Sequence, residues 1–189
     1  MATAKTGYHH GDLRTALIDA GLALTRTGGP EALTIREATR RVGVSPNAAY
    51  RHFADREALL SAVASAIQHQ MAARMARRHG SELQLSAVGL GYIKFALDEP
   101  GWFAVAFFGA GAGETAGAPP YLALVEALDA MVESGQLSAK RRAGAEWPCW
   151  SAVHGFAELA LRGPLKNAGR RDVEALARRT VDDIIAGIR

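Results

Sequence analysis

The segment covering residues 33–60, LTIREATRRVGVSPNAAYRHFADREALL, constrains the fold of this 189-residue chain more than any other. Thr34 is a suitable N-cap, and Glu37 three residues later completes a capping box that opens a helix. A glycine ends that helix after about two turns, and Ser45 and Pro46 open a second helix of similar length. Two short helices joined by a tight turn form a helix-turn-helix, whose second helix can enter a DNA major groove. DNA binding is therefore the first hypothesis.

The second helix has two distinct faces. Ala49 and Phe53 are four residues apart and share the face that packs on the first helix. Asn47, Ala48 and Arg51 then point away from that helix. These three side chains are predicted to meet base edges and phosphates.

The run GVSPNAAYRHFADREALL resembles the signature of the TetR family of transcriptional regulators. In that family a Tyr-x-His-Phe run closes the recognition helix and a basic residue opens the fourth helix. The corresponding residues here are Tyr50, His52, Phe53 and Arg56, and the match extends over roughly residues 8–62. The family more often has lysine where Arg56 stands, so the positive charge is kept.

The resemblance implies an all-α fold of about nine helices. Residues 1–57 would form a three-helix helix-turn-helix head, and residues 58–189 a helical domain for ligand binding and dimerisation. It also implies that Asn47 and Ala48 contact base edges and that Arg36 contacts a base or phosphate. The phosphate contacts that it implies are those of Thr34, Ser45, Tyr50, His52 and Arg56. The full predicted DNA-binding set is Thr34, Arg36, Ser45, Pro46, Asn47, Ala48, Tyr50, Arg51, His52 and Arg56.

Positive charge is concentrated in the first part of the chain. Residues 1–80 carry 11 Lys and Arg against 6 Asp and Glu, whereas residues 81–189 carry 11 against 13. The excess coincides with the helix-turn-helix, where DNA phosphates would be neutralised. Charged runs are also common on solvated helix faces, so the excess supports DNA binding only together with the motif.

The bulk composition is that of a soluble globular protein, with 49% hydrophobic and 22% charged residues. No apolar run reaches the roughly 18 residues that a membrane helix requires. The opening MATAKTGYHHGD lacks the apolar core of a signal peptide, which predicts a cytoplasmic protein. The single cysteine, Cys149, excludes a disulfide within the chain.

Apolar residues recur at helical spacing along most of the chain. They predict helices over residues 12–27, 55–79, 81–97, 121–134, 139–161 and 172–188, with a kink or restart near Pro148. The short aromatic run after Pro100 is predicted to line the interior of the second domain. Residues 109–120 are rich in glycine but lack the spacing of a nucleotide-binding loop, so we interpret them as a flexible connection.

A second motif, WSAVHGFAELAL, resembles the Trp-x-x-x-His-Gly signature in the regulatory domain of one TetR subgroup, whose leader the opening YHHGDL also resembles. In the family the last two helices form a four-helix dimer interface, and the apolar face of residues 172–188, with no partner left in the chain, fits that arrangement. The aromatic residues are too many for a small helical core unless some wall a cavity. The predicted ligand-binding set is Trp102, Phe103, Phe107, Tyr121, Trp147, Trp150 and His154, and the alternative is a solid core.

An enzyme would need a catalytic constellation, for which the best candidates are Cys149, His154 and Glu158. On a helix Cys149 and His154 lie about 140° apart around the axis, so they do not face each other as a nucleophile and its base must. His154 and Glu158 share a face, but no further His or Cys nearby completes a tetrahedral metal site. We therefore expect no catalytic residue, no metal and no cofactor.

Two hypotheses remain for the whole chain. The first is a homodimeric transcriptional regulator, most simply a repressor, that binds a palindromic operator in double-stranded DNA and is released by a small apolar or aromatic effector. The second is a DNA-binding protein whose second domain is only a dimerisation scaffold and binds no inducer. The two differ in whether the aromatic residues enclose a pocket.

Overall fold

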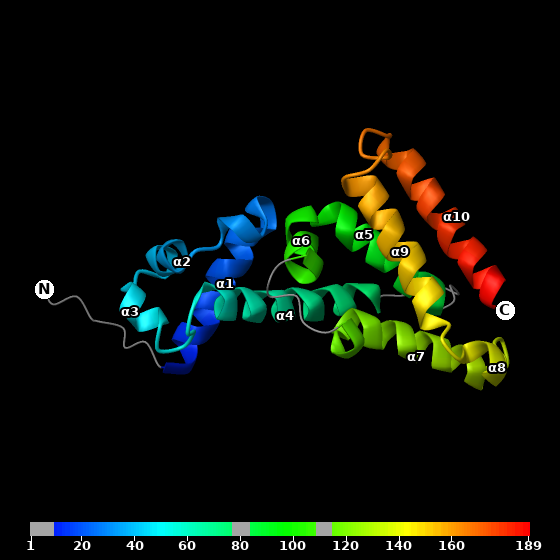
Figure 1. Ribbon diagram of the computed structural model, residues 1–189, viewed down its shortest axis with the longest axis horizontal. Coiled ribbons are helices and arrows are strands. Elements are labelled where there is room, and N and C mark those ends of the chain that lie inside the picture. The colour runs from blue at the N-terminus through cyan, green and yellow to red at the C-terminus, as the bar shows by residue number, and fades with distance from the viewer. Residues whose placement is uncertain (1–9, 77–83, 109–114) are drawn as a thin grey trace, which may run out of the picture. The chain divides into compact units, whose positions relative to one another are not determined.

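The computed structural model describes residues 10–76, 84–108 and 115–189. Within these ranges the chain forms ten α-helices and two short 3-10 helices, and no strand (Figure 1). The predicted all-α fold class is therefore confirmed, with ten helices where about nine were expected. Contacts divide the chain into two compact units. The domain boundary after residue 57 stays a prediction.

Unit 1 comprises Met1–Ile67 together with Gly101–Ala112. Its elements are α1 (His10–Gly28), η1 (Pro30–Ala32), α2 (Ile35–Val42), α3 (Pro46–Ala49), the first part of α4 (Arg56–Met75) and α6 (Pro100–Phe108). Helices α1 and α4 approach closely, because a Cβ on Gly21 would lie 2.5 Å from a methyl group of Val63. The interior of the unit is built from fully buried side chains of α1, α4 and the chain before α2: Leu17, Leu33, Leu59, Val63 and Ile67.

The ends of α2 follow from local sequence. The Thr34 side chain accepts a hydrogen bond from the Glu37 amide at 3.1 Å, and Gly43 ends the helix with a left-handed φ of 78°. Only half of the predicted capping box forms, because the Glu37 carboxylate binds Arg40 at 2.6 and 2.9 Å. Helix α3 is one turn long rather than the expected two, and the chain continues through turns as far as Phe53.

Unit 2 comprises Gln68–Pro100 together with Gly113–Arg189. Its elements are the last part of α4, α5 (Gln84–Asp98), η2 (Thr115–Gly117), α7 (Pro119–Glu133), α8 (Ala139–Arg142), α9 (Glu146–Leu161) and α10 (Arg170–Ile188). Helix α5 packs against α7, α9 and α10, and most of its residues are buried. It is therefore the central helix of the unit, as predicted.

A glycine and a proline mark the boundary between α8 and α9 in unit 2, as the sequence predicts. Gly144, with a φ of 76°, separates α8 from α9, and Pro148 lies in the first turn of α9, where a missing N–H leaves no acceptor unsatisfied. The restart near Pro148 is thus confirmed. The predicted N-cap Ser81 and the first half of the glycine-rich connection, residues 109–114, lie outside the described residues. The second half is not an irregular connection, because it contains η2 and the start of α7.

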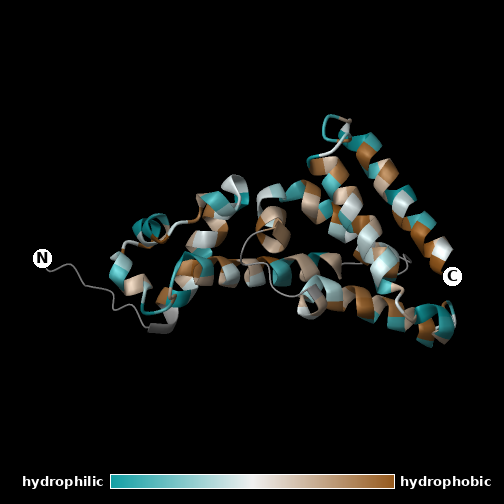
Figure 2. Ribbon diagram, viewed as in Figure 1, coloured by the Kyte–Doolittle hydropathy of each residue, from teal (hydrophilic) through white to brown (hydrophobic). Residues whose placement is uncertain are grey.

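Two helices depart from the sequence-based expectations. Helix α6 belongs to unit 1 and not to the interior of the second domain, because the Trp102 indole donates a hydrogen bond to the Leu22 carbonyl at 2.9 Å and Gly101 lets the backbone meet the end of α1. Apolar and polar residues alternate along α10 (Figure 2). Its apolar face already packs within the chain, since Val181, Ile185 and Ile188 are buried against α5 and α9.

Candidate DNA-binding surface and ligand pocket

The ten predicted DNA-binding residues lie on α2, on α3, and on the short segments around them up to the start of α4. Ala49 and Phe53 are buried, with 0% and 3% exposure, so α3 packs inward through the expected face. Asn47 and Arg51 are exposed, and Ala48 is half-buried beside them. The helix-turn-helix therefore presents the side chains that the pattern predicts, together with Thr34, Arg36, Ser45, Pro46 and Tyr50, which are also exposed.

The arginine side chains of this surface differ in whether they form ion pairs within the chain. Arg40 is paired with Glu37, and hydrogen bonding to Arg40 lowers the pKa of Glu37. Arg36 and Arg51 form no ion pair within the described part of the chain. No acidic side chain in this part of the chain neutralises the two guanidinium groups. Both charges are therefore available for a contact with a DNA phosphate or base.

Arg56 has a different environment from the other predicted phosphate contacts. Its Nε donates to the Leu33 carbonyl at 2.7 Å and its Nη2 donates to the Pro30 carbonyl at 2.6 Å. Its third nitrogen binds Glu57. The guanidinium therefore joins the first turn of α4 to the segment that leads into α2.

Sequence reasoning missed one residue of this unit. The guanidinium of Arg14, on α1, lies 5.2 Å from the centre of the Phe53 ring, the residue on which α3 rests. Arg14 is exposed and forms no ion pair among the described residues. No sequence motif marks it, because the contact depends on how α1 crosses the helix-turn-helix.

A pocket lies inside unit 2 and is lined almost entirely by apolar groups. Its volume is about 360 Å³ including its mouth, and its interior has room for about one water molecule. The lining residues come from α4, α5, α7, α9 and α10: Met75, Leu85, Val88, Gly89, Tyr92, Pro120, Leu124, Cys149, Trp150, Val153, Val181, Ile184 and Ile185. None of these lining side chains is charged.

The structure brings together four of the seven predicted ligand-binding residues. Trp150 stacks on His154 with ring centres 6.2 Å apart, and Tyr121 contacts both Trp150 and Trp147 at 5.9 and 5.8 Å. Only Trp150 of these four lines the pocket itself, and Trp147 is 53% exposed. Trp102, Phe103 and Phe107 lie on α6 in unit 1.

Tyr92 is a pocket residue that the sequence analysis did not select. Its ring meets Trp150 edge-on at 5.2 Å. The signal was available, because Leu85, Val88 and Tyr92 recur at the spacing of one helix face. The denser aromatic residues beyond position 100 obscure it.

The Tyr92 hydroxyl gives the pocket wall a polar group with a strong partner, since it lies 2.8 Å from Nδ1 of His154. Burial raises the pKa of Tyr92, and desolvation lowers the pKa of His154 although Glu158 opposes the effect. At neutral pH the bond therefore joins an uncharged hydroxyl to an uncharged imidazole, and the imidazole tautomer sets which of the two groups donates. This bond orients both rings and leaves the cavity uncharged.

The environment of Cys149 does not suit nucleophilic chemistry. Burial raises the pKa of its thiol to about 11, so very little thiolate exists at neutral pH. Among the described residues no three His, Cys, Asp or Glu side chains gather as metal ligands. The pocket is built for apolar contact.

Comparisons with known proteins agree with this architecture. Residues 17–63 match the family model for bacterial regulatory proteins of the tetR family, and residues 85–184 match the model for the tetracyclin repressor-like C-terminal domain. A search of curated proteins finds no match.

Solved structures with the same fold cover nearly the whole chain. A protein with unknown function from Rhodococcus sp. RHA1 is 25% identical over 97% of this chain and 98% of its own, with a TM-score of 0.74. A TetR variant from Acinetobacter baumannii AYE, in complex with minocycline, is 22% identical over 96% of each chain, with a TM-score of 0.67. A TetR family transcription regulator from Marinobacter aquaeolei VT8 is 18% identical over 91% of this chain and 94% of its own, with a TM-score of 0.60.

The two family models together cover both the helix-turn-helix and the helical second half, and the second model alone spans more than half of the sequence. They describe DNA-binding regulators, which are not enzymes. The chain belongs to the TetR family of transcriptional regulators.

Proposed function

We propose that this protein is a ligand-responsive repressor that acts in the cytoplasm and binds a palindromic operator as a homodimer. The observation that carries the proposal is the inward packing of Ala49 and Phe53, which leaves Asn47 and Arg51 exposed on a positively charged head. None of the helices in the described residues is long and apolar enough to cross a membrane.

The DNA contacts divide into reading and positioning. Asn47 and Ala48 would meet base edges, Arg36 a base or phosphate, and Arg51 a phosphate. The head would be positioned on the DNA phosphate backbone by Thr34, Ser45, Tyr50 and His52. Pro46 would hold the start of α3 in place. Two such heads enter successive major grooves when their recognition helices are about 34 to 36 Å apart.

The pocket of unit 2 supports the regulatory half of the proposal. A small apolar or aromatic effector would lie against Trp150 and Tyr92, with Tyr121, Trp147 and His154 behind them. The effector would lower operator affinity by binding more tightly to a state of the dimer in which the two heads are not spaced for DNA. The size of the effect depends on the difference in effector affinity between the two states. Because the cavity has room for about one water molecule, an effector must displace side chains as it enters.

The narrow cavity also favours a second candidate function. A unit 2 packed this tightly could serve as a dimerisation scaffold in a DNA-binding protein that has no inducer. Trp150→Ala separates the two candidates. If the protein is a ligand-responsive repressor, an aromatic effector raises the melting temperature of the wild type more than that of the Trp150→Ala variant. The same compound releases operator DNA from the wild type.

The primary experiment is selection of DNA by the purified protein from a pool of random-sequence duplexes. A palindrome with half-sites one helical turn apart supports an operator-binding dimer, and retention of DNA without any common sequence contradicts it. The selected duplex then serves as the probe for a screen of neutral aromatic compounds. If none of them both stabilises the protein and releases the duplex, the scaffold function is the better account.

A further inference from the structure

One arginine of unit 1 lies beside the helix-turn-helix without belonging to it. Arg14 is close to the start of α1, whereas the ten predicted DNA-binding residues lie on α2, on α3 and on the segments around them. Helix α1 contacts α3 (Figure 1), and the Arg14 guanidinium lies over the Phe53 ring, 5.2 Å from its centre. The Phe53 amide donates to the Ala49 carbonyl at 3.0 Å in the turn that follows α3. Arg14 is therefore next to the carboxyl-terminal end of the predicted recognition helix.

The contact with Phe53 keeps the Arg14 side chain at the surface. Phe53 is only 3% exposed, whereas Arg14 is exposed, so the guanidinium covers the ring from the solvent side. Contact with an aromatic ring uses none of the guanidinium N–H groups in a conventional hydrogen bond. Because the ring also limits the conformations of the side chain, less conformational entropy is lost when an anion binds to it.

The charge of Arg14 is not neutralised within the described part of the chain, where it forms no ion pair. The positions one turn later on α1 are Leu17 and Ile18, which carry no charge. Asp55, the first acid after α3 in sequence, accepts a hydrogen bond from the Ala58 amide at 2.8 Å and so caps α4. The guanidinium is therefore available to an anion outside the chain.

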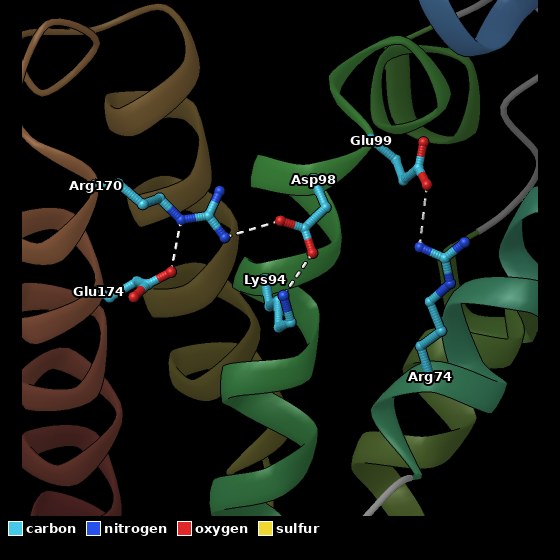
Figure 3. A network of polar contacts seen from close by, with 6 residues as sticks. All are labelled: Arg74, Lys94, Asp98, Glu99, Arg170 and Glu174. Carbon is cyan, nitrogen blue, oxygen red and sulfur yellow. Dashed lines mark hydrogen bonds and ion pairs between the residues drawn. The ribbon is translucent and has the colours of Figure 1, made fainter.

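Arg14 differs in this respect from an arginine that joins helices in unit 2. Arg170 of α10 donates to Asp98 of α5 at 2.8 Å and to Glu174 at 2.6 Å (Figure 3). Its charge is neutralised by the contacts that it makes. Arg14 also connects two elements, but it does so through an uncharged ring, so the connection leaves its positive charge at the surface.

We propose that Arg14 binds a backbone phosphate of the operator in each half-site, beside the phosphates contacted by Tyr50 and His52. Both of these residues lie between α3 and Phe53, so Arg14 extends the predicted phosphate-binding surface from the helix-turn-helix onto α1. A guanidinium offers both the charge and the paired donors that phosphate oxygens accept. The inference rests on the proposed binding of operator DNA. The contact positions the head and reads no base.

Arg14→Met tests the contact, because methionine keeps an apolar group on the Phe53 ring and removes the charge. Binding of the full chain to the selected operator duplex is measured at about 50 to 200 mM salt. We expect affinity to fall about tenfold or more and the salt slope to decrease by about one per half-site. Preference for the operator over an unrelated duplex should not change. A salt slope equal to that of the wild type would overturn the proposal.

Two control variants separate a phosphate contact from net charge and from packing. Arg14→Lys keeps the charge and should keep the salt slope of the wild type. Arg171→Met removes an exposed arginine of α10 and should bind the operator like the wild type. An equal decrease of the slope in Arg171→Met would attribute the effect to net charge and contradict the contact. So would an Arg14→Met variant that melts earlier and binds more weakly with an unchanged slope, because Arg14 would then act only through the packing of Phe53.

Neutral methylphosphonates placed one at a time along the operator backbone locate the phosphate. At one position of each half-site the substitution should weaken wild-type binding about tenfold and leave Arg14→Met unaffected, since that variant has already lost the contact. Tyr50→Phe should remain sensitive at the same position. Additive losses for Arg14→Met at every position would contradict the proposal. They would leave operator binding by the wild type intact, whereas a wild type that retains no DNA would refute the proposed function and this contact together.

Discussion

Arg56 shows how much one side chain at the start of a helix can determine. The resemblance assigns it a phosphate contact, yet its guanidinium bridges two backbone carbonyls that precede α2. Hydrogen bonds from a charged donor to buried acceptors stabilise a fold by about 1.5 to 3 kcal/mol. The structure therefore gives Arg56 a role in holding the head together whether or not it also touches DNA.

Lysine at position 56 separates the two roles. Arg56→Lys keeps the charge but loses the paired carbonyl contacts, so we expect it to lower the stability of unit 1 by about 1 to 2 kcal/mol while leaving the salt dependence of DNA binding unchanged. Arg51→Ala, at an exposed cation, should lower the salt slope by about one per half-site with little effect on stability. Denaturant melts and titrations at several salt concentrations measure both. A stable Arg56→Lys variant would refute the bridging role.

Asn47 is the residue best placed to read a base. Asn47→Ala should cost about 1 to 3 kcal/mol on the selected operator and relax preference at one position of each half-site. Because Asn47 is exposed, the fold should be unaffected. Binding to a panel of single-base variants measures the effect. Equal losses on every duplex would assign Asn47 to the DNA backbone.

At the scale of elements, the contact of α5 with α10 depends on a charge that pH can remove. Burial would raise the pKa of Asp98, but hydrogen bonds from Lys94 and Arg170 outweigh it and lower that pKa. A carboxyl with a depressed folded-state pKa stabilises the fold at pH values above its unfolded-state pKa of about 4, and this contribution is lost as pH falls through the folded-state value.

Asp98→Asn should accordingly be less stable than the wild type at neutral pH. The difference should shrink below about pH 4, as the wild-type carboxyl takes up its proton. Glu126→Gln is a suitable control, because Glu126 is exposed and forms no ion pair among the described residues. Urea melts between pH 3 and 7 provide the comparison. A constant difference across that range would show that the α5–α10 contact does not depend on the Asp98 charge.

The elements also show which features sequence reasoning could predict. The ends of α2 and the break before α9 depend on Thr34, Gly43 and Gly144, which act on their own turns, so their effects are local and readable. The membership of α6 and the in-chain packing of α10 depend on residues far apart in sequence, and no periodicity specifies them. Periodicity places Tyr92 on one face of α5 with Leu85 and Val88, but it does not show that this face lines a pocket. The exposed face of the helix-turn-helix is predictable for the same local reason as α2, whereas the pocket lining is only partly so.

At the scale of the whole molecule, the packing of α10 changes how assembly should be tested. Ile185 is 6% exposed and lies in the chain's own interior, so a charge there unfolds the protein before it reports on dimerisation. Leu159 of α9 and Leu176 of α10 are 46% and 42% exposed. We propose that these two side chains face the partner chain if the last two helices form the dimer interface.

Leu159→Asp with Leu176→Asp should therefore dissociate a dimer while leaving the helical circular dichroism spectrum unchanged. Ile185→Asp serves as the contrasting variant, expected to lose helicity. Light scattering at micromolar concentration gives the oligomeric state. Should the Leu159 and Leu176 variant remain dimeric, the interface lies on other helices.

The position of α6 has a consequence for how this protein can be recombined. Its contacts place it in unit 1, although the segments before and after it in sequence belong to unit 2. The unit that carries the helix-turn-helix is thus assembled from two separate stretches of chain. A fragment ending at residue 67 would lack Trp102 and expose the Leu22 carbonyl that accepts its hydrogen bond. Chimeras that exchange DNA specificity between relatives should therefore carry residues 100–108 along with the amino-terminal helices, because a single crossover point cuts through the module.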